Sequence, residues 1–226
     1  MPQLAQLAVV IPVGPGDTAW RGLLPLLAGL PKSTEVLLSM TEHDTQDSAN
    51  ATRSVRVIRG PAGRGRQLNA GAAATTQPWL WFLHADSRLD DVALRAIERH
   101  GDSPALSYFD LRFHDGGVAM RINALGVWLR SRVLRLPFGD QGLLLPRAEF
   151  ERLGGFDEQL ASGEDHALVW AARRAGLPLR PLHAYLSTSA RKYGEQGWWQ
   201  TTARHLRLTW SQARQFSANK PSSSRR

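Results

Sequence analysis

A histidine and an aspartate stand directly after a run of apolar residues in the first half of the sequence. The run covers residues 79–83, and His84 and Asp86 follow it. A carboxylate at the carboxyl end of a buried strand can hold a hard cation against a pyrophosphate, so Asp86 is the candidate ligand for Mg²⁺ or Mn²⁺. The alternative is that Asp86 or Ser87 caps a helix starting near Asp90, and this segment alone leaves both interpretations open. A single histidine such as His84 is more often structural than a ligand.

Two adjacent carboxylates, Glu164 and Asp165, follow Gly163 at the expected start of a helix. A carboxylate within hydrogen-bond reach of an acceptor hydroxyl can take its proton while charge develops in the transition state. The alternative is that these acids only complement the dipole of the helix, which favours negative charge at its first turn.

A glycine-rich segment over residues 60–71 follows one expected strand and opens a helix. Its exposed main-chain amides, together with Arg64 and Arg66, could receive phosphate charge. The segment has neither the P-loop pattern nor the dinucleotide-binding glycine spacing. Taken alone, it is also what a glycine-rich turn with arginines in solvent would look like.

The elements that must position these groups alternate between strand and helix patterns. Such alternation predicts an α/β fold with one doubly wound, mainly parallel sheet, which binds ligands beyond the carboxyl ends of its strands. We expect strands over residues 7–12, 35–39, 55–59, 79–83 and 106–113, helices over 20–29, 67–75, 119–136, 165–175 and 199–216, and a turn over 138–142.

Composition narrows the function classes. The 226 residues include no cysteine, which excludes disulfides, thiolate metal sites and a cysteine nucleophile. Most of the net charge of +8 lies in residues 191–226, which contain 8 lysines and arginines and one glutamate. The rest of the chain is almost balanced in charge and offers no broad basic surface, so we expect no nucleic-acid partner. No apolar run is long enough to span a membrane, and a cytoplasmic location is the simplest expectation.

Four motifs occur in an order that resembles the family 2 glycosyltransferases of the GT-A (nucleotide-diphospho-sugar transferase) fold. They are Gly-Arg-Gly-x-Gln-Leu-Asn-x-Gly at 63–71, Phe-Leu-His-Ala-Asp-Ser at 82–87, Phe-Gly-Asp-Gln-Gly at 138–142 and Gly-Gly-Phe-Asp-Glu-x-Leu-x-x-Gly-Glu-Asp at 154–165. The likeness covers about residues 7–193. More narrowly, the chain resembles the short subgroup associated with radical-SAM and selenium-domain proteins, of the arsenosugar biosynthesis type.

The resemblance implies a role for particular residues. Asp86 matches the last acidic position of the family's metal-binding Asp-x-Asp motif, Asp165 the general base and Glu164 its supporting neighbour. Asp140 and Gln141 match positions that shape the sugar and acceptor pocket. The positions implied for the nucleotide and donor are Pro12, Asp17, Glu42, Arg64, Asn69, His84 and Arg191.

The sequence departs from the family pattern at three places. The first strand is followed by Gly14, with Asp17 as a loose equivalent of the usual acidic residue. The second strand lacks the aspartate that ends it in the family and contacts the nucleoside, and Glu42 is the residue that could replace it. His84 replaces the first acid of the metal motif, so one carboxylate with donor phosphates and water would have to suffice for the ion.

These observations predict a hexosyltransferase-type glycosyltransferase that moves a sugar from a nucleotide-diphosphate donor to an acceptor hydroxyl, with inversion and Mg²⁺ or Mn²⁺. There are two alternatives. The protein could catalyse sugar-phosphate nucleotidyl transfer, or it could be a non-catalytic relative that binds a partner or anionic surface through its basic tail. The expected organisation is a GT-A domain over residues 1–194, an amphipathic helix over 195–216 and a disordered tail over 217–226. The sequence leaves open peripheral membrane contact through that helix and a homodimer.

Overall fold

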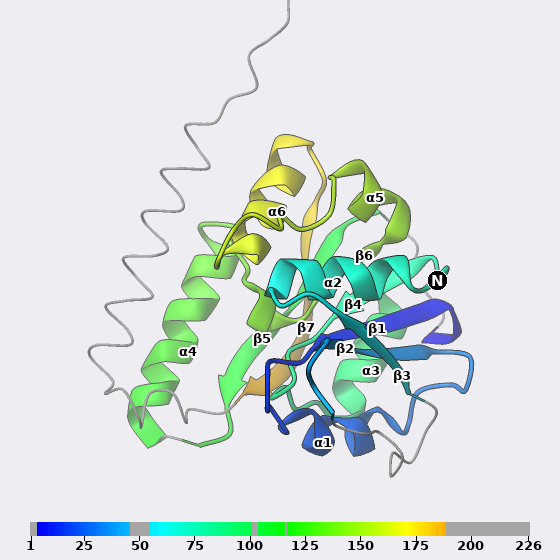
Figure 1. The fold of residues 1–226 in the computed structure, drawn as a ribbon. Coiled ribbons are helices and arrows are strands. Elements are labelled where there is room, and N and C mark those ends of the chain that lie inside the picture. Colours follow the sequence, from blue (N-terminus) through cyan, green and yellow to red (C-terminus); the bar gives the residue numbers. More distant parts are fainter. Residues whose placement is uncertain (1–3, 46–54, 101–103, 116, 189–226) are drawn as a thin grey trace, which may run out of the picture.

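A seven-stranded sheet organises the chain. In the computed structural model, which describes residues 4–45, 55–100, 104–115 and 117–188, the strand order is β3-β2-β1-β4-β6-β5-β7 (Figure 1). The strands are β1 (Leu7–Pro12), β2 (Glu35–Thr41), β3 (Arg56–Gly60), β4 (Trp79–Phe82), β5 (Leu106–Phe113), β6 (Leu143–Pro146) and β7 (Leu179–Thr188).

Most strand pairs in this sheet are parallel. Strand β1 lies between β2 and β4 and is parallel to both, whereas β6 runs antiparallel to β4 and β5. The chain therefore leaves β1 towards one side and later returns to its other side. This reversal of strand order brings the carboxyl ends of β1, β2 and β4 to one edge, where ligands bind in doubly wound folds.

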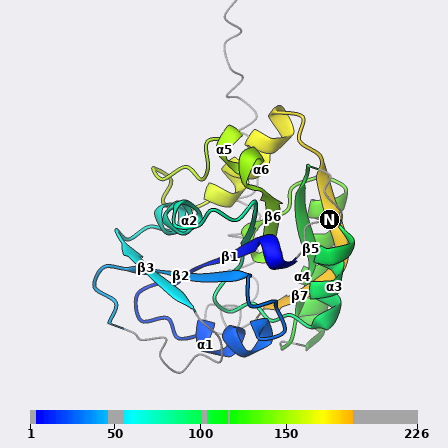
Figure 2. The same cartoon turned by 90° about the vertical axis from the view of Figure 1, so that its right-hand side faces the viewer.

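Helices cover both faces of the sheet (Figure 2). Helices α1 (Trp20–Leu23) and α3 (Asp91–Arg99) pack on one face, and α2 (Arg64–Ala73), α5 (Arg147–Arg152) and α6 (Glu164–Arg174) pack on the other. The remaining helical elements are α4 (Gly117–Arg132) and the 3₁₀ turns η1 (Leu4–Gln6), η2 (Leu24–Leu27) and η3 (Gly139–Gln141).

The apolar character of the central strands follows from burial on both faces. Along β1, Leu7, Val9 and Ile11 belong to one core cluster, whereas Ala8 and Val10 belong to the other. Alternate side chains of a strand point to opposite faces, so a strand covered on both sides must be apolar throughout. The central strands therefore appear in the sequence as continuous apolar runs.

The structure confirms the predicted α/β fold and most of its elements. Strands β1 and β5 have the predicted bounds, and other elements differ by a few residues at their ends. The helix predicted over 20–29 is wrong as one element: α1 ends at Leu23 and a 3₁₀ turn follows, with Pro25 supplying no main-chain N–H donor. The sequence patterns missed β6, α5 and β7. The predicted helix over 195–216 and the tail lie outside the described residues.

Among the residues that the structure describes, no helix has both the length and the apolar character to cross a membrane.

Candidate functional site

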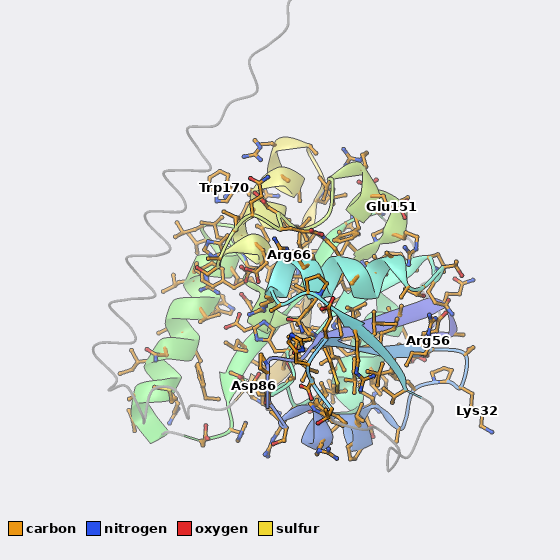
Figure 3. The ribbon with its side chains drawn as sticks, in the orientation of Figure 1. Lys32, Arg56, Arg66, Asp86, Glu151 and Trp170 are labelled. Carbon is orange, nitrogen blue, oxygen red and sulfur yellow. The ribbon has the colours of Figure 1, made fainter. Side chains whose placement is uncertain are left out.

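His84 and Asp86 lie just beyond the end of β4, at the edge where β1 and β2 also end. Figure 3 shows Asp86 on the side of the molecule from which α2 begins. Thr188 Oγ1, at the end of β7, donates a 3.1 Å hydrogen bond to Asp86 Oδ2. The N-cap of α3 is Asp90, whose carboxylate accepts a 3.0 Å bond from the Ala93 amide. Capping therefore does not account for Asp86.

The turn before β6 touches the first turn of α6. The main-chain amide of Gly139 donates a 2.6 Å hydrogen bond to Oδ2 of Asp165, and the amide of His166 donates a 2.9 Å bond to Oδ1. Asp165 is thus fixed by main-chain donors from two elements. Its carboxylate also lines a small cavity with Arg64, His84 and Gly139.

Arg64, the first residue of α2, connects the strand edge to α6. Its Nε lies 3.0 Å from Oε1 of Glu164, and its Nη2 contacts Nε2 of His84. A carboxylate therefore neutralises one side of the guanidinium, while the imidazole lies against the other.

Gly139 lies at the centre of these groups because it has no side chain. A Cβ atom there would be 3.0 Å from both Arg64 Nη2 and Asp165 Oδ2, and 3.2 Å from His84 Nε2. The site therefore contains a cation, an imidazole and a carboxylate around one main-chain position.

The electrostatic surroundings lower the pKa of Asp165. Burial alone would raise it, but the charges of Arg64 and His166 and the amides of Gly139 and His166 outweigh that effect. Asp165 is therefore ionised at neutral pH.

The two neighbouring carboxyl groups are shifted in the opposite direction. Burial is the main cause that raises the pKa of Asp140, with Asp165 adding to it and Arg130 opposing it. Burial also raises the pKa of Glu164, again with Asp165 adding and Arg64 opposing. Environments that separate the pKa values of adjacent carboxyl groups are typical of acid and base sites, although ion-pair networks also produce them.

Gln141 and Arg130 fix the turn over residues 138–142. Gln141 is fully buried, accepts bonds from Arg130 Nη2 (3.1 Å) and the Phe138 amide (3.2 Å), and donates to the Phe109 carbonyl (2.9 Å). Its side chain positions the turn and leaves little capacity for the sugar contact expected from sequence. Oδ1 of neighbouring Asp140 is buried and has no hydrogen-bond partner among the described residues.

Sequence reasoning passed over Arg130, His166 and Gln67. The guanidinium of Arg130 lies 3.1 Å from the ring centroid of Phe138, and the His166 ring packs against the same phenyl ring at 3.5 Å. No short motif marks Arg130, because it reaches the turn from α4. His166 directly follows Asp165, and this adjacency was the available signal.

Gln67 and Asn69 act as ties between segments. Gln67 Nε2 donates 2.7 Å bonds to the carbonyls of Val13 and Ser39, which joins the ends of β1 and β2. Asn69 exchanges bonds with the main chain of Phe156 and donates to Glu158, so its amide is used inside the fold.

The other expected donor positions are dispersed. Pro12 ends β1, and Asp17 accepts a 2.9 Å bond from the Ala19 amide at the start of α1. Glu42 is exposed just past β2, whereas Asp44, which was not a candidate, is buried. Arg191 lies outside the described residues.

The donor set fits a cation shared with a ligand better than one held by protein alone. No group of three or more histidine or acidic residues able to hold a metal occurs in the described ranges. Asp86 supplies one carboxylate beside His84, and Mg²⁺-type sites commonly use one or two carboxylates plus substrate phosphates and water.

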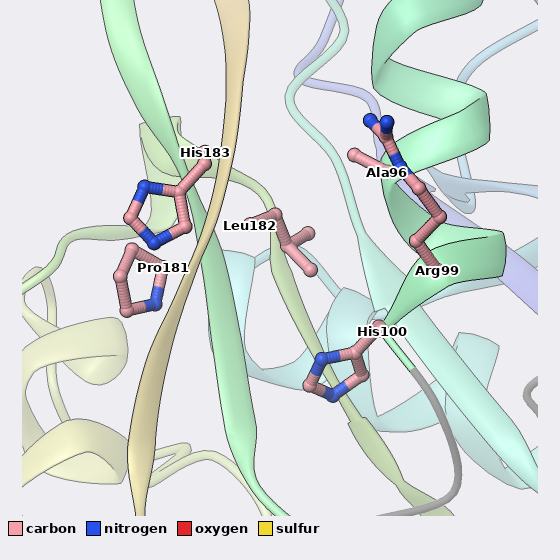
Figure 4. A pocket seen from close by; sticks show the side chains of 6 residues that line it. All are labelled: Ala96, Arg99, His100, Pro181, Leu182 and His183. Atoms are coloured by element: carbon pink, nitrogen blue, oxygen red, sulfur yellow. The ribbon is translucent and has the colours of Figure 1, made fainter.

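A second pocket, of about 450 Å³, lies between the end of α3 and the first half of β7 (Figure 4). It contains His100, Arg99 and His183 but no carboxylate. Burial and the charge of Arg180 lower the pKa of His100, whose Nε2 is 2.9 Å from Ser107 Oγ. Figure 4 shows His183 and Leu182 on opposite sides of the β7 ribbon. This pocket shares no lining residue with the cavity beside Asp165.

No protein-family model and no curated protein matches the chain. Solved structures do resemble it. The mannosyltransferase PcManGT from Pyrobaculum calidifontis, in complex with GDP-Man and Mn²⁺, is 18% identical with a TM-score of 0.68, over 93% of this chain and 64% of that one. S. aureus TarS is 17% identical with a TM-score of 0.62, over 81% and 36%.

A third structure is glucosyl-3-phosphoglycerate synthase from Mycobacterium tuberculosis with Mn²⁺, UDP and phosphoglyceric acid, which is 17% identical with a TM-score of 0.59, over 87% of this chain and 76% of that one. The chain spans about a third of TarS and just under two thirds of the mannosyltransferase. At these identities the likeness establishes the fold, which is GT-A as predicted.

Proposed function

We propose that this protein is a glycosyltransferase that moves a sugar from a nucleoside-diphosphate sugar to an acceptor hydroxyl. The observation that carries the proposal is the convergence of Arg64, His84 and Asp165 around Gly139, at the carboxyl edge of a GT-A sheet. Cationic and acidic groups beside each other suit a reaction in which a diphosphate leaves while a hydroxyl loses its proton.

On the donor side, Arg64 provides fixed positive charge. Its side chain is 40% exposed, and Glu164 orients it through the 3.0 Å contact to Nε. An arginine is suited to diphosphate because its planar donor groups match phosphate oxygens. Asp86, oriented by Thr188, would hold a divalent cation, which would offset the negative charge on the departing diphosphate when bound. The Mn²⁺ in two of the resembling structures supports this assignment.

On the acceptor side, Asp165 is the proposed general base. Ionised and fixed by the Gly139 amide, it would accept the acceptor's proton as the new bond forms between acceptor oxygen and anomeric carbon and the bond to the diphosphate oxygen breaks. One displacement of this kind inverts the anomeric centre. Glu164 supports Asp165 indirectly, because it orients the neighbouring Arg64.

Donor binding is the direct test. Calorimetric titration with UDP, GDP and their sugar conjugates, each with and without Mn²⁺, should show metal-dependent binding that Asp86→Ala loses. The matched control is Asp91→Ala, which removes an exposed carboxylate on α3. Absence of binding by every one of these nucleotides would overturn the donor proposal.

Product analysis tests the reaction itself. A released nucleoside diphosphate is the expected product of glycosyl transfer, whereas pyrophosphate would establish nucleotidyl transfer to a sugar phosphate instead.

A further inference from the structure

Helix α4 exposes an apolar stripe to solvent. Val118, Ile122, Leu125 and Leu129 recur at helical spacing and are 70%, 57%, 57% and 47% exposed. Trp128 widens the stripe with a side chain that is 45% exposed. A contiguous set of large apolar side chains on a surface usually marks an interaction site.

The rest of the protein contacts α4 through the opposite side of the helix. Its buried residues are Met120 and Ser131. Near its end, Arg130, which also lies on the side opposite the stripe, donates a 3.1 Å bond to Gln141 in the turn before β6. Figure 1 shows α4 at the border of the molecule. The exposed fractions of the apolar side chains place the stripe on its solvent side.

The charged residues of this segment all have one sign. Residues 117–135 contain Arg121, Arg130, Arg132 and Arg135 and no aspartate or glutamate. Arg130 and Arg132 bond inward to Gln141 and Asp110, whereas Arg121 and Arg135 are exposed. A surface with exposed apolar side chains and exposed cations matches one that offers both acyl chains and anionic headgroups.

We propose that α4 docks the protein on an anionic membrane surface, with Val118, Ile122, Leu125, Trp128 and Leu129 entering the interface. Lipid acyl chains would cover the apolar stripe, while anionic headgroups would pair with Arg121 and Arg135. A second copy of α4 would bring like charges together. The chain's own C-terminal segment would do the same, because residues 191–226 carry 8 basic residues against one acidic residue. This inference does not depend on the proposed transferase activity.

Vesicle sedimentation of the full-length protein tests the docking. Little protein should sediment with vesicles of phosphatidylcholine alone. Including phosphatidylglycerol in the vesicles should increase the amount of bound protein, and added salt should reduce it. Leu125→Glu and, separately, Leu129→Glu should each weaken vesicle binding on the order of tenfold or more. Each variant replaces an apolar side chain that would enter the membrane by a negative charge that the anionic headgroups repel. Both positions are exposed, so folding should be retained.

Val92→Glu is the matched control, because Val92 is a 45% exposed apolar residue on α3. It should bind vesicles as the wild type does. The proposal is overturned if wild-type protein ignores anionic vesicles or if the α4 variants bind undiminished. It is also overturned if Trp199→Glu with Trp210→Glu in the C-terminal segment abolishes binding while the α4 variants do not. Conversion of a wild-type dimer to monomer by Leu125→Glu, without vesicle binding, would assign the stripe to a second copy instead.

Discussion

The main-chain amide of Gly139 lies 2.6 Å from Oδ2 of Asp165 and donates a hydrogen bond to it. This bond joins the turn before β6 to the first turn of α6, which are 26 residues apart in the sequence. Because the donor is an amide of the main chain, the side-chain oxygen of an asparagine at position 165 can still accept its bond, whereas the asparagine nitrogen cannot accept the second bond, from the His166 amide. Asp165→Asn therefore removes the charge while it can keep the contact to Gly139.

Asp165→Asn should reduce sugar transfer by about 10²- to 10⁴-fold, because an amide cannot accept the acceptor's proton. Donor affinity should stay within a few-fold of the wild-type value, since Arg64 and Asp86 are retained. Single-turnover transfer and calorimetric donor binding measure the two effects. Asp157→Asn removes an exposed carboxylate that accepts a 2.9 Å bond from the Gln159 amide in its own turn, and it should leave both unchanged. Normal transfer by Asp165→Asn would exclude Asp165 as the base.

Gly139→Ala should impair transfer while the protein stays folded. The added methyl group would lie 3.0 Å from Arg64 Nη2 and from Asp165 Oδ2, so the two side chains must separate. Since small displacements of reacting groups are costly, we expect a loss of roughly 100-fold in kcat.

Gly126→Ala on α4 is the control, because a Cβ atom there has no neighbour within 4 Å. It should stabilise the protein by about 0.5–1 kcal/mol, as expected for glycine replaced by alanine within a helix, and leave kcat unchanged. Equal kcat values for both variants would show that the spacing at Gly139 is not critical.

The pH dependence of stability should respond in opposite directions to two isosteric changes. Burial raises the pKa of Asp140, so the folded state retains a proton that the unfolded state has lost, and the stability falls as pH rises from 3.8 to the raised pKa. Asp140→Asn removes this loss and should gain stability relative to the wild type as pH rises through that range.

Asp165 should behave in the opposite way. Its lowered pKa stabilises the folded state above 3.8, and this contribution disappears as pH falls through the lowered value. Asp165→Asn should therefore destabilise at neutral pH and approach the wild type in acid. Urea unfolding at several pH values measures both differences, and slopes of the same sign for the two variants would contradict the assigned shifts.

The fold could be predicted from sequence because local patterns determine most of it. Continuous apolar runs mark strands buried on both faces, and glycines or prolines separate them. Strand β6 escaped prediction because its four residues, Leu143–Pro146, directly follow the turn and are too few to show a period. Strand β7 contains Pro181 and exposed polar positions, which suit an edge strand but resemble a loop.

The site could be predicted only in part, for a related reason. Asp86, Glu164 and Asp165 lie within short motifs, and the structure places Glu164 and Asp165 beside Arg64. The contact between Arg64 and His84, and the support of the turn by Arg130, depend on how α2 and α4 pack. Packing between distant segments leaves no spacing pattern in a single sequence.

Asn69 provides a test between binding and structural roles, since its position in the Gly-Arg-Gly-x-Gln-Leu-Asn motif suggested donor contact. Its Oδ1 accepts a 3.0 Å bond from the Phe156 amide, and its Nδ2 donates to the Phe156 carbonyl at 2.9 Å and to Glu158 at 2.8 Å. Asn69→Ala would leave these groups without their partners, which should lower the free energy of unfolding by about 1–3 kcal/mol. If Asn69 acts as a tie, the donor affinity of the folded fraction should change by less than a few-fold. Asn123→Ala, on α4, is the control for loss of an amide. It should affect neither quantity, because the Asn123 amide makes a weak 3.8 Å contact with the Met120 sulfur. Loss of donor binding by Asn69→Ala at unchanged stability would instead assign Asn69 to the nucleotide.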